Sequence, residues 1–348
     1  MLPYLTSCKD NSLPVEKPYL KSLGDNVFLH ESDMAVEFRI TSAELDFWNN
    51  DKGDISKLTG TVCKKFNNDF DFIFMVLNNQ KMPSSTNYAG LFTPIRNDIQ
   101  GTGSSGIYDV SSSYGSGNRL KGAITLPALS FVKDGPSLHE LAHHCAAYVV
   151  STYALDKDGK QINYYDHWGY SDAGGQMGGF KAEYVTSNLD GIPNKYQAGY
   201  KSKEEGFGIN SNGRNRIPYS KIELYLWGLI PKTEVPPLKV YSGLSLPVNE
   251  TRKGVFFATN VKTYTIDDIV ASNGERSPNV SNSQKAFRIL TVVVSVNPVN
   301  ESEWSIVNND LDWFSKQTDD GNIDLFNFWE ATGGRATMKV DGLKNSLK

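Results

Sequence analysis

Runs of apolar residues of strand length recur in the first and last thirds of the chain, separated by polar and glycine-rich stretches. Such runs, rich in aromatic and β-branched residues, are typical of buried strands. One of them, Phe70–Leu77, is apolar at every position except Asp71. We predict strands at residues 27–29, 35–40, 70–77 and 119–127, within 240–265, and at 287–296.

Apolar residues at helical spacing alternate with these runs. They predict helices at residues 60–66, 138–150, 219–231 and 304–316. Ser137 precedes the second of these as a plausible N-cap, and Glu140 follows it at the spacing of a capping box. Together with the strands, these helices predict an α+β fold.

Composition shifts suggest three regions. Residues 1–25 contain three prolines and scattered charges, and we expect them to form a tether. Residues 26–235 are expected to form a zincin-like catalytic domain, for reasons given below. Residues 236–348 follow a Pro-Pro joint and read as a β-rich C-terminal portion, either separate or part of the same domain.

The segment His139-Glu140-Leu141-Ala142-His143 carries the most specific chemical pattern in the chain. Positions i and i+4 of a helix share one face, so the two imidazoles can bind a single cation. Glu140 can reach a water beside that cation without binding the cation itself. Zinc lowers the pKa of such a water towards ~7, and the carboxylate then takes its proton. We therefore predict Zn²⁺ bound by His139 and His143, with Glu140 as general base.

Two helix ligands leave a catalytic zinc one protein ligand short. His167 is the expected third ligand, because it lies on a glycine-flanked loop that can fold back under the helix. His144 points about 100° away from His143 on a helix, so we expect it to pack or to support the site from behind. His30 is remote in sequence and reads as structural. The alternatives to His167 are carboxylates: Glu223 first, then Glu183 and Asp166, the last of which could instead hold a ligand histidine in its working tautomer.

Three segments together resemble a family of secreted bacterial and archaeal zincin-type metalloproteases. They are His139–His144, His167–Gly169 with Gly174–Gly179, and Tyr219–Pro231; Phe328–Thr337 also resembles that family's ending. The likeness covers residues ~60–340 and implies a zincin fold and a protease, without naming a substrate. The chain departs from the family at Trp227, where members usually have Met, and at Glu223, where they often have Asp. The second departure would change the reach of that carboxylate if it binds metal.

Other residues are candidates for roles around such a site. Met177 either fills the core or forms a floor beneath the zinc, and we favour the core. Tyr170 and Tyr225 are candidates to stabilise an oxyanion. The Gly101–Gly106 loop lacks the Lys-Ser/Thr ending of a phosphate-binding loop, and we expect it to form a rim of the cleft. Lys121 reads as a solvated strand charge.

Composition and charge limit the remaining possibilities. The 348 residues, 39% hydrophobic and 21% charged, are enough for a sizeable core in one large domain or two moderate ones. The net charge of −4 includes no basic block, which argues against a nucleic-acid surface. Three cysteines cannot build a disulfide framework, and we expect Cys145 to be a buried core residue.

The first residues bear on location. Leu5-Thr6-Ser7-Cys8 resembles a bacterial lipobox, in which the cysteine becomes the lipidated N-terminus, but no apolar stretch precedes it. A lipid anchor at Cys8 and an accidental match both stay open. No run of 18 apolar residues predicts a membrane span. We expect an extracellular or cell-surface protein that contacts a membrane only through such an anchor.

These expectations converge on a zinc-dependent endopeptidase that hydrolyses proteins or peptides outside the cell, with Glu140 carrying a proton to the leaving amine. Two alternatives stay open at this point. One is a zinc hydrolase acting on cell-wall or glycoprotein substrates, since the same activation of water would serve. The other is a non-catalytic surface protein that keeps zinc as a brace, although a brace has no need of Glu140.

Overall fold

The computed structural model describes residues 20–103, 106–146, 148–149, 153–155, 158, 161–163 and 166–348. The lipobox-like segment with Cys8 therefore lies outside the described residues. Across the described ranges, no helix combines the length and the apolar character needed to span a membrane.

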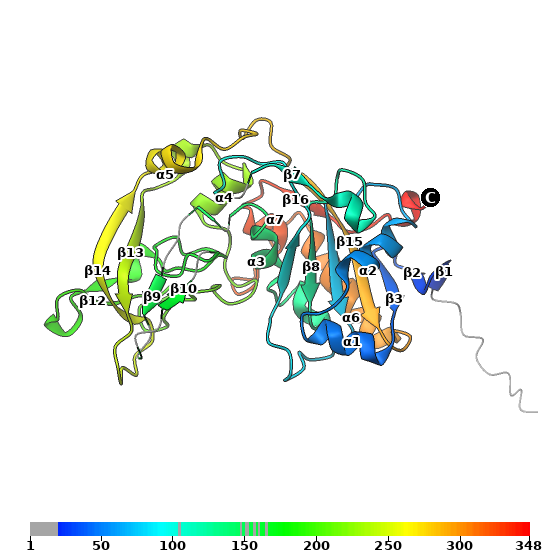
Figure 1. Cartoon of the computed structure of the whole chain (residues 1–348), viewed down its shortest axis with the longest axis horizontal. Coiled ribbons are helices and arrows are strands. Elements are labelled where there is room, and N and C mark those ends of the chain that lie inside the picture. Colours follow the sequence, from blue (N-terminus) through cyan, green and yellow to red (C-terminus); the bar gives the residue numbers. More distant parts are fainter. Residues whose placement is uncertain are drawn as a thin grey trace, which may run out of the picture.

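A large mixed sheet fills one half of the molecule (Figure 1). Its strands lie in the order β1-β2-β3-β15-β4-β8-β5, with β16 against β15. The central strands β3, β15, β4 and β8 run parallel, whereas β1, β2 and the edge strand β5 pair antiparallel. The bounds are β1 (Leu20–Gly24), β2 (Val27–His30), β3 (Ala35–Arg39), β4 (Phe72–Leu77), β5 (Leu91–Pro94), β8 (Gly122–Leu126), β15 (Ala286–Ser295) and β16 (Thr337–Lys339).

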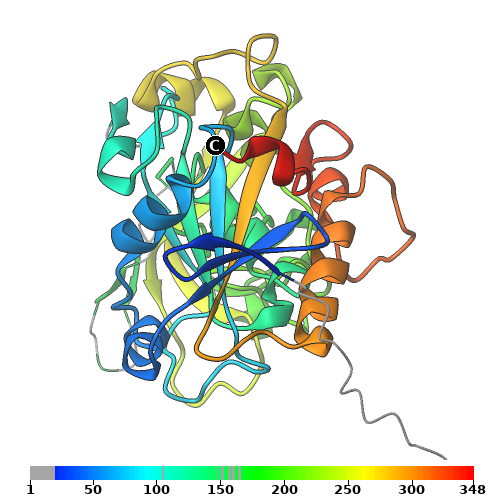
Figure 2. The same cartoon turned by 90° about the vertical axis from the view of Figure 1, so that its right-hand side faces the viewer.

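Helices cover both faces of this sheet, which explains why its central strands are apolar throughout. In β4 the side chains of Phe72, Phe74 and Val76 enter one core, and those between them enter the opposite core. Helices α1 (Ser42–Asn49) and α2 (Ile55–Cys63) lie on one side, and α6 (Glu301–Ser315) with α7 (Phe328–Ala331) lies on the other (Figure 2).

A second sheet forms the other half, in the order β10-β9-β13-β14-β12-β11 (Figure 1). An aromatic cluster around Tyr170, Phe180 and Phe256 packs against it. The bounds are β9 (Tyr153–Leu155), β10 (Gln161–Asn163), β11 (Thr186–Ser187), β12 (Lys195–Gln197), β13 (Leu238–Ser245) and β14 (Val255–Tyr264); β6 (Arg96–Asn97) and β7 (Tyr108–Asp109) form a small separate pair.

The remaining helices connect the two halves and their loops. They are α3 (Ser137–Ala142), α4 (Lys221–Trp227) and α5 (Ile266–Asn273), with 3₁₀ turns η1 (Ser111–Tyr114), η2 (Leu129–Val132), η3 (Ala182–Tyr184), η4 (Leu189–Gly191), η5 (Lys232–Glu234) and η6 (Lys344–Ser346).

The structure is a mixed α and β fold, compatible with the α+β class expected from the sequence. The division expected at residue 236 does not separate two sheets, because β15 lies between β3 and β4, and β13 and β14 pair with strands from before residue 236. The tether predicted at residues 1–25 extends too far, because residues 20–24 form β1 and pair with β2. The helix expected at 138–150 was also too long, since α3 ends at Ala142.

Candidate metal centre

Helix α3 is held at its N-terminus by a side chain distant in sequence. Asn215 accepts a hydrogen bond from the backbone N–H of Leu138 through Oδ1 (3.1 Å). Its Nδ2 donates to the carbonyl of Val132 (3.0 Å). The Ser137 hydroxyl donates to that same carbonyl (2.7 Å) instead of capping the helix. The capping box expected from Ser137 and Glu140 is therefore wrong: Asn215 takes over the N-terminus, and Glu140 is left facing the cleft.

The last turn of α3 tightens after Ala142. The N–H groups of His144 and Cys145 bond to carbonyls three residues back, at Leu141 and Ala142. His143 itself keeps helical backbone angles (φ −57°, ψ −21°), so it remains one turn below His139 on the same face. The two rings lie 4.7 Å apart between centroids, and their Nε2 atoms are separated by 3.1 Å.

His167 joins this pair from the loop that follows the second sheet's first two strands. Its Nε2 lies 3.3 Å from Nε2 of His139, and the two rings are stacked. Among the described residues, these three histidines form one of two groups that bring potential metal ligands within 4.8 Å of one another. Zinc–nitrogen bonds of ~2.0–2.1 Å at tetrahedral angles would place ligand nitrogens about 3.3 Å apart. The observed separations therefore fit a tetrahedral zinc site.

The hydrogen bonds of the Nδ1 atoms, which point away from the other histidines, decide which tautomers His139 and His167 adopt. Nδ1 of His139 donates to the carbonyl of Gln176 (2.7 Å), and Nδ1 of His167 donates to Oδ1 of Asp166 (2.9 Å). Each ring then carries a lone pair, not a proton, on Nε2, and these two lone pairs face each other across 3.3 Å. Two lone pairs at that distance repel unless a cation lies between them. Such hydrogen bonds to the outer nitrogen are the usual support of metal-binding histidines.

A tight glycine hairpin at residues 174–179 ties the metal-site loops together. Its Gln176 carbonyl accepts from His139, and its Met177 carbonyl accepts from the N–H of Trp168, next to His167 (2.8 Å). Glu223 of α4 holds this hairpin in place. It is fully buried, and it accepts from the N–H of Met177 through Oε1 (2.7 Å) and from the N–H of Ser220 through Oε2 (2.7 Å).

Glu223 is therefore not a member of the histidine group, contrary to the alternative that the sequence left open. Its two oxygens are engaged by backbone N–H groups. A side chain on Gly175 would collide with it, because a Cβ there would lie 2.0 Å from Glu223 Oε2. Glu223 acts on the centre indirectly, through the hairpin that orients His139.

Burial keeps the three histidines neutral at pH 7. Desolvation lowers the pKa of His139 to about 4, assisted by the neighbouring His167 ring. Desolvation also lowers the pKa of His143 well below its ordinary value, and it lowers that of His167 against the opposing pull of Asp166. Neutral imidazole is the form that binds a metal, so protons compete little for this site at neutral pH.

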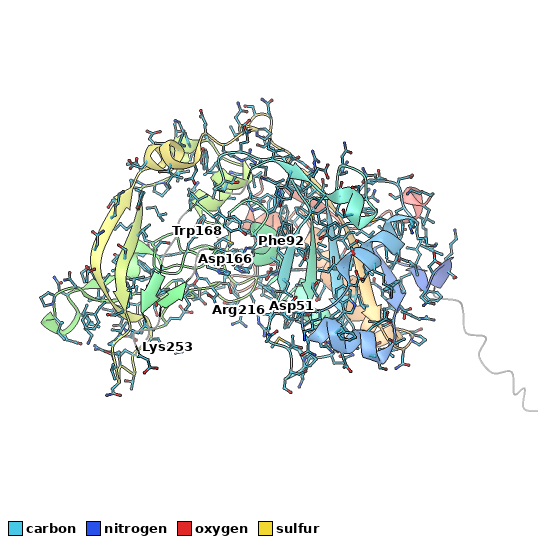
Figure 3. The ribbon with its side chains drawn as sticks, in the orientation of Figure 1. Asp51, Phe92, Asp166, Trp168, Arg216 and Lys253 are labelled. Carbon is cyan, nitrogen blue, oxygen red and sulfur yellow. The ribbon has the colours of Figure 1, made fainter. Side chains whose placement is uncertain are left out.

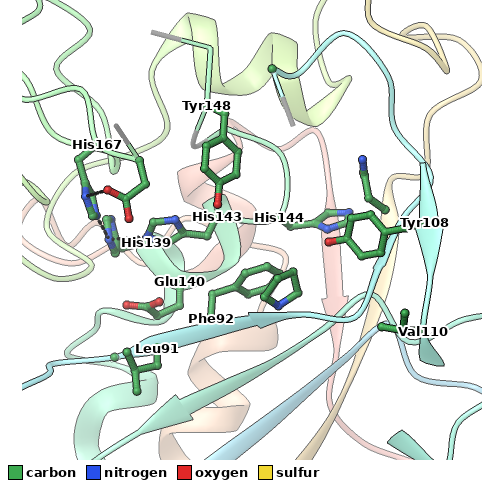
Figure 4. Close-up of a pocket in the computed structure, with 15 residues that line it drawn as sticks. Leu91, Phe92, Tyr108, Val110, His139, Glu140, His143, His144, Tyr148 and His167 are labelled. Carbon is green, nitrogen blue, oxygen red and sulfur yellow. Dashed lines mark hydrogen bonds and ion pairs between the residues drawn. The ribbon is translucent and has the colours of Figure 1, made fainter. Parts of the chain in front are cut away.

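Glu140 lies beside the histidines with its carboxylate facing the cleft (Figure 4). Burial, with a smaller contribution from Asp166, raises its pKa to about 8. A nearby dication would act in the opposite direction and favour the carboxylate. The backbone of Gly90 approaches Glu140 closely: a Cβ at this position would lie 2.6 Å from Glu140 Oε1.

The centre opens into a cleft of about 1000 Å³ between the two halves of the molecule. Phe92 and Asp166 both line it and lie in the middle of the structure (Figure 3). The ring of Phe92 stacks near His143 (6.5 Å between centroids), and Tyr148 directs its hydroxyl towards His143 from above (Figure 4). The cleft is lined by Gly90, Leu91, Phe92, Pro94, Asn97, Gly103, Tyr108, Val110, His139, Glu140, His143, His144, Tyr148, Asp166 and His167.

Several sequence candidates lie outside this cleft. Tyr170 is buried in the aromatic cluster, and Tyr225 is buried with its hydroxyl accepting from the N–H of Arg276; neither residue lines the cleft where an oxyanion would form. Met177 belongs to the core, as favoured, and Glu183 is exposed in η3. His30 stacks on Trp304 far from the cleft, and Cys145 is a core residue, both as expected.

Other lining residues carried no recognisable sequence signal. Gly90, Phe92 and Tyr148 reach the cleft only because β5 and the chain after α3 pass over the histidines. Gly103 of the Gly101–Gly106 loop lines the cleft, as expected, and Tyr108 and Val110 line it as well. Lys121 was misread: it is buried at 4% exposure and forms a two-oxygen ion pair with Asp98 (2.9 Å to each oxygen).

Comparisons with protein-family models, with curated proteins and with solved structures found no match for this chain. The geometry of the cleft is therefore the basis for assigning a function to this chain.

Proposed function

We propose that this chain is a zinc-dependent endopeptidase with a zincin-like catalytic domain, acting on proteins or peptides outside the cell. The observation that carries the proposal is that three neutral imidazoles lie close together. In two of them, His139 and His167, Nδ1 donates a hydrogen bond to an oxygen and leaves the lone pair of Nε2 free. A buried glutamate follows the first of these histidines in the helix. Three histidines with an open fourth position are a ligand set of catalytic zinc.

The edge strand β5 supports a peptide as substrate. It pairs with β8 on one side, and in the described structure no strand pairs with its other side. Gly90, Leu91, Phe92 and Pro94 line the cleft beside the histidines. An extended peptide can add to such an edge through backbone hydrogen bonds, independently of its sequence. This would bring a peptide bond past the three imidazoles.

In this mechanism, zinc and three residues around it have distinct roles. Bound zinc supplies Lewis acidity, which polarises a carbonyl and makes water nucleophilic near neutral pH. Gln176 and Asp166 fix the rings of His139 and His167, so their lone pairs stay directed inward. Glu140 accepts the proton of the attacking water and delivers it to the leaving nitrogen. Its environment suits both steps, because burial raises its pKa while a cation would lower it.

The test is a Glu140→Gln variant, which keeps the shape of the side chain but removes the base. We expect it to bind zinc like the wild type and to lose a factor of ~10²–10⁴ in the hydrolysis of unfolded casein. Glu183→Gln, which removes an exposed carboxylate outside the cleft, is the matched control and should behave as wild type.

Parallel assays on cell-wall fragments and glycoproteins separate the hydrolase alternatives. Hydrolysis of those substrates with no cleavage of casein or peptides would replace the endopeptidase by a hydrolase of another class. If zinc binds but no substrate is hydrolysed by the wild type, the zinc is a brace and the proposal is wrong.

A further inference from the structure

A second cavity, of about 160 Å³, adjoins the cleft at His144. His144 lines both spaces, and the chain crosses from one to the other between Asn97 in the cleft and Asp98 in the cavity. The cavity has room for several waters or for the end of an acidic side chain. Its polar walls include Lys121, Trp227 and Arg276.

Two residues that line this cavity have a buried side-chain nitrogen with no hydrogen-bond partner. Nε2 of His144 and Nε1 of Trp227 are unpartnered, although the two residues are only 8% and 2% exposed. Their rings lie 6.1 Å apart between centroids. Leaving a buried N–H such as that of Trp227 unsatisfied is costly, and both residues line the cavity, so the cavity is the place where a missing acceptor would lie.

The charges around the cavity select the kind of acceptor. Arg276 is 5% exposed and donates to the carbonyls of Leu226 (2.8 Å) and Trp227 (3.0 Å), to that of Pro278, and to the Ser283 hydroxyl. All these acceptors are neutral, and no carboxylate pairs with Arg276 within the described ranges. A buried cation without an anion is unfavourable.

Asp98 does not supply the missing anion, because its carboxylate already pairs with Lys121 (2.9 Å) and with Arg96 (3.3 Å). The charged side chains lining the cavity are Lys121, Arg276 and Asp98, which give two positive charges against one negative, a net charge of +1. The remaining lining residues with polar side chains, Asn282, Ser283 and Gln284, are neutral. The cavity therefore favours an anion.

We propose that this cavity is a carboxylate-binding subsite, and that it holds the side chain of an Asp or Glu residue of the peptide bound in the cleft. The assignment to a substrate side chain rests on the proposed endopeptidase function, whereas the carboxylate chemistry does not. A carboxylate would accept from Trp227 Nε1 and His144, and it would balance Arg276. A neutral amide would leave that charge unbalanced.

The first experiment maps cleavage sites in a peptide mixture by mass spectrometry. We expect Asp and Glu to be enriched at one position near the cleaved bond. Paired peptides with Glu or Gln at that position should differ about tenfold in kcat/KM for the wild-type enzyme. Cleavage with no acidic preference would overturn the subsite while leaving the endopeptidase proposal intact.

The variant Trp227→Phe removes one N–H and keeps a buried aromatic ring. It should reduce the Glu-to-Gln ratio to near one, with the loss confined to the Glu peptide. Trp304→Phe is the matched control, because Trp304 Nε1 is also buried and unpartnered but lies in α6, away from the cleft. An equal loss of acidic preference in both variants would contradict a specific role for Trp227.

A binding assay separates the sources of the carboxylate and does not require catalysis. The melting temperature of the Glu140→Gln protein is measured with sodium acetate, with the Glu peptide and with the Gln peptide. Stabilisation by the Glu peptide alone supports a substrate side chain, and stabilisation by acetate as well shows that free carboxylates also enter. If neither acetate nor the Glu peptide stabilises the protein more than the Gln peptide does, the cavity is not a carboxylate site.

Discussion

Gly90 offers a direct test of how Glu140 is positioned, since replacing it by alanine adds one methyl group against the proposed base. The new Cβ would lie 2.6 Å from Glu140 Oε1, 2.7 Å from Pro136 Cγ and 2.8 Å from Glu140 Cγ. Ordinary contact begins at 3.4 Å, so the carboxylate is 3.4 − 2.6 = 0.8 Å too close. Because Pro136 confines the methyl group on the other side, we expect Glu140 to move by about this amount.

A displacement of about 1 Å at a reacting group costs about 10²-fold in rate. We therefore expect Gly90→Ala to lower kcat on a peptide about a hundredfold and to destabilise the fold by ~1–3 kcal/mol through overpacking. Zinc content should not change, because the atoms nearest to the added methyl group belong to Glu140 and Pro136 and not to the histidines. Kinetics, metal analysis and urea unfolding together measure these three effects.

Gly60→Ala is the matched control. Gly60 lies in α2, where an added Cβ meets nothing within 4 Å, so alanine should leave activity unchanged and stabilise the fold by ~0.4–1 kcal/mol. Full activity of Gly90→Ala would refute the placement of Glu140 against β5. Loss of zinc in that variant would show that the methyl group disturbs the metal centre and not the base.

Three further predictions concern the groups around the histidines. Asp166→Asn removes the charge behind His167, and a chelator competition should show zinc affinity 10–100-fold lower; unchanged affinity would rule out this supporting role. Glu223→Gln forces an amide N–H₂ against the N–H of either Met177 or Ser220, so zinc affinity should fall similarly and unfolding should cost ~1–3 kcal/mol less. In metal-free protein, Glu140 has a pKa of about 8 in the folded chain, whereas its ordinary pKa of ~4.5 applies in the unfolded chain. Between these pH values the folded chain binds one proton more than the unfolded chain does. The free energy of unfolding therefore falls by ~1.4 kcal/mol per pH unit as pH rises from about 4.5 to 8. Glu140→Gln should therefore become increasingly more stable than the wild type over that range in urea unfolding with chelator present, and parallel pH profiles would contradict the buried carboxylate.

Local patterns were enough to predict five strands of the large sheet (β2, β3, β4, β8 and β15) and the three histidines, but not β1, β5 or β16. The run at 70–77 is apolar at every position except Asp71, which is typical of a strand covered on two sides, as β4 is. The spacing of His139 and His143 fixes their shared face as soon as the backbone is helical. His167 could be proposed because it lies on a glycine-flanked loop able to fold back under the helix, and because the chain has only five histidines.

The features that the sequence missed depend on contacts between distant segments. Ser137 has the spacing of a cap, but Asn215 arrives from 78 residues away and takes the helix N-terminus. Lys121 looks like a surface charge until Asp98 is brought against it from a neighbouring strand pair. Glu223 has the chemistry of a metal ligand, but two backbone N–H groups already engage its oxygens. Such competition between partners cannot be read from spacing.

The claim on which the whole account depends is that His139, His143 and His167 hold one metal ion together. Titrating metal-free protein with zinc in the presence of a competing chelator measures this most directly. We predict one zinc ion per wild-type chain, an affinity at least ~100-fold lower in His167→Ala, and no change in His30→Ala, whose ring stacks on Trp304 far from the cleft. Wild-type affinity in His167→Ala, or no stoichiometric zinc in the wild type, would contradict the account.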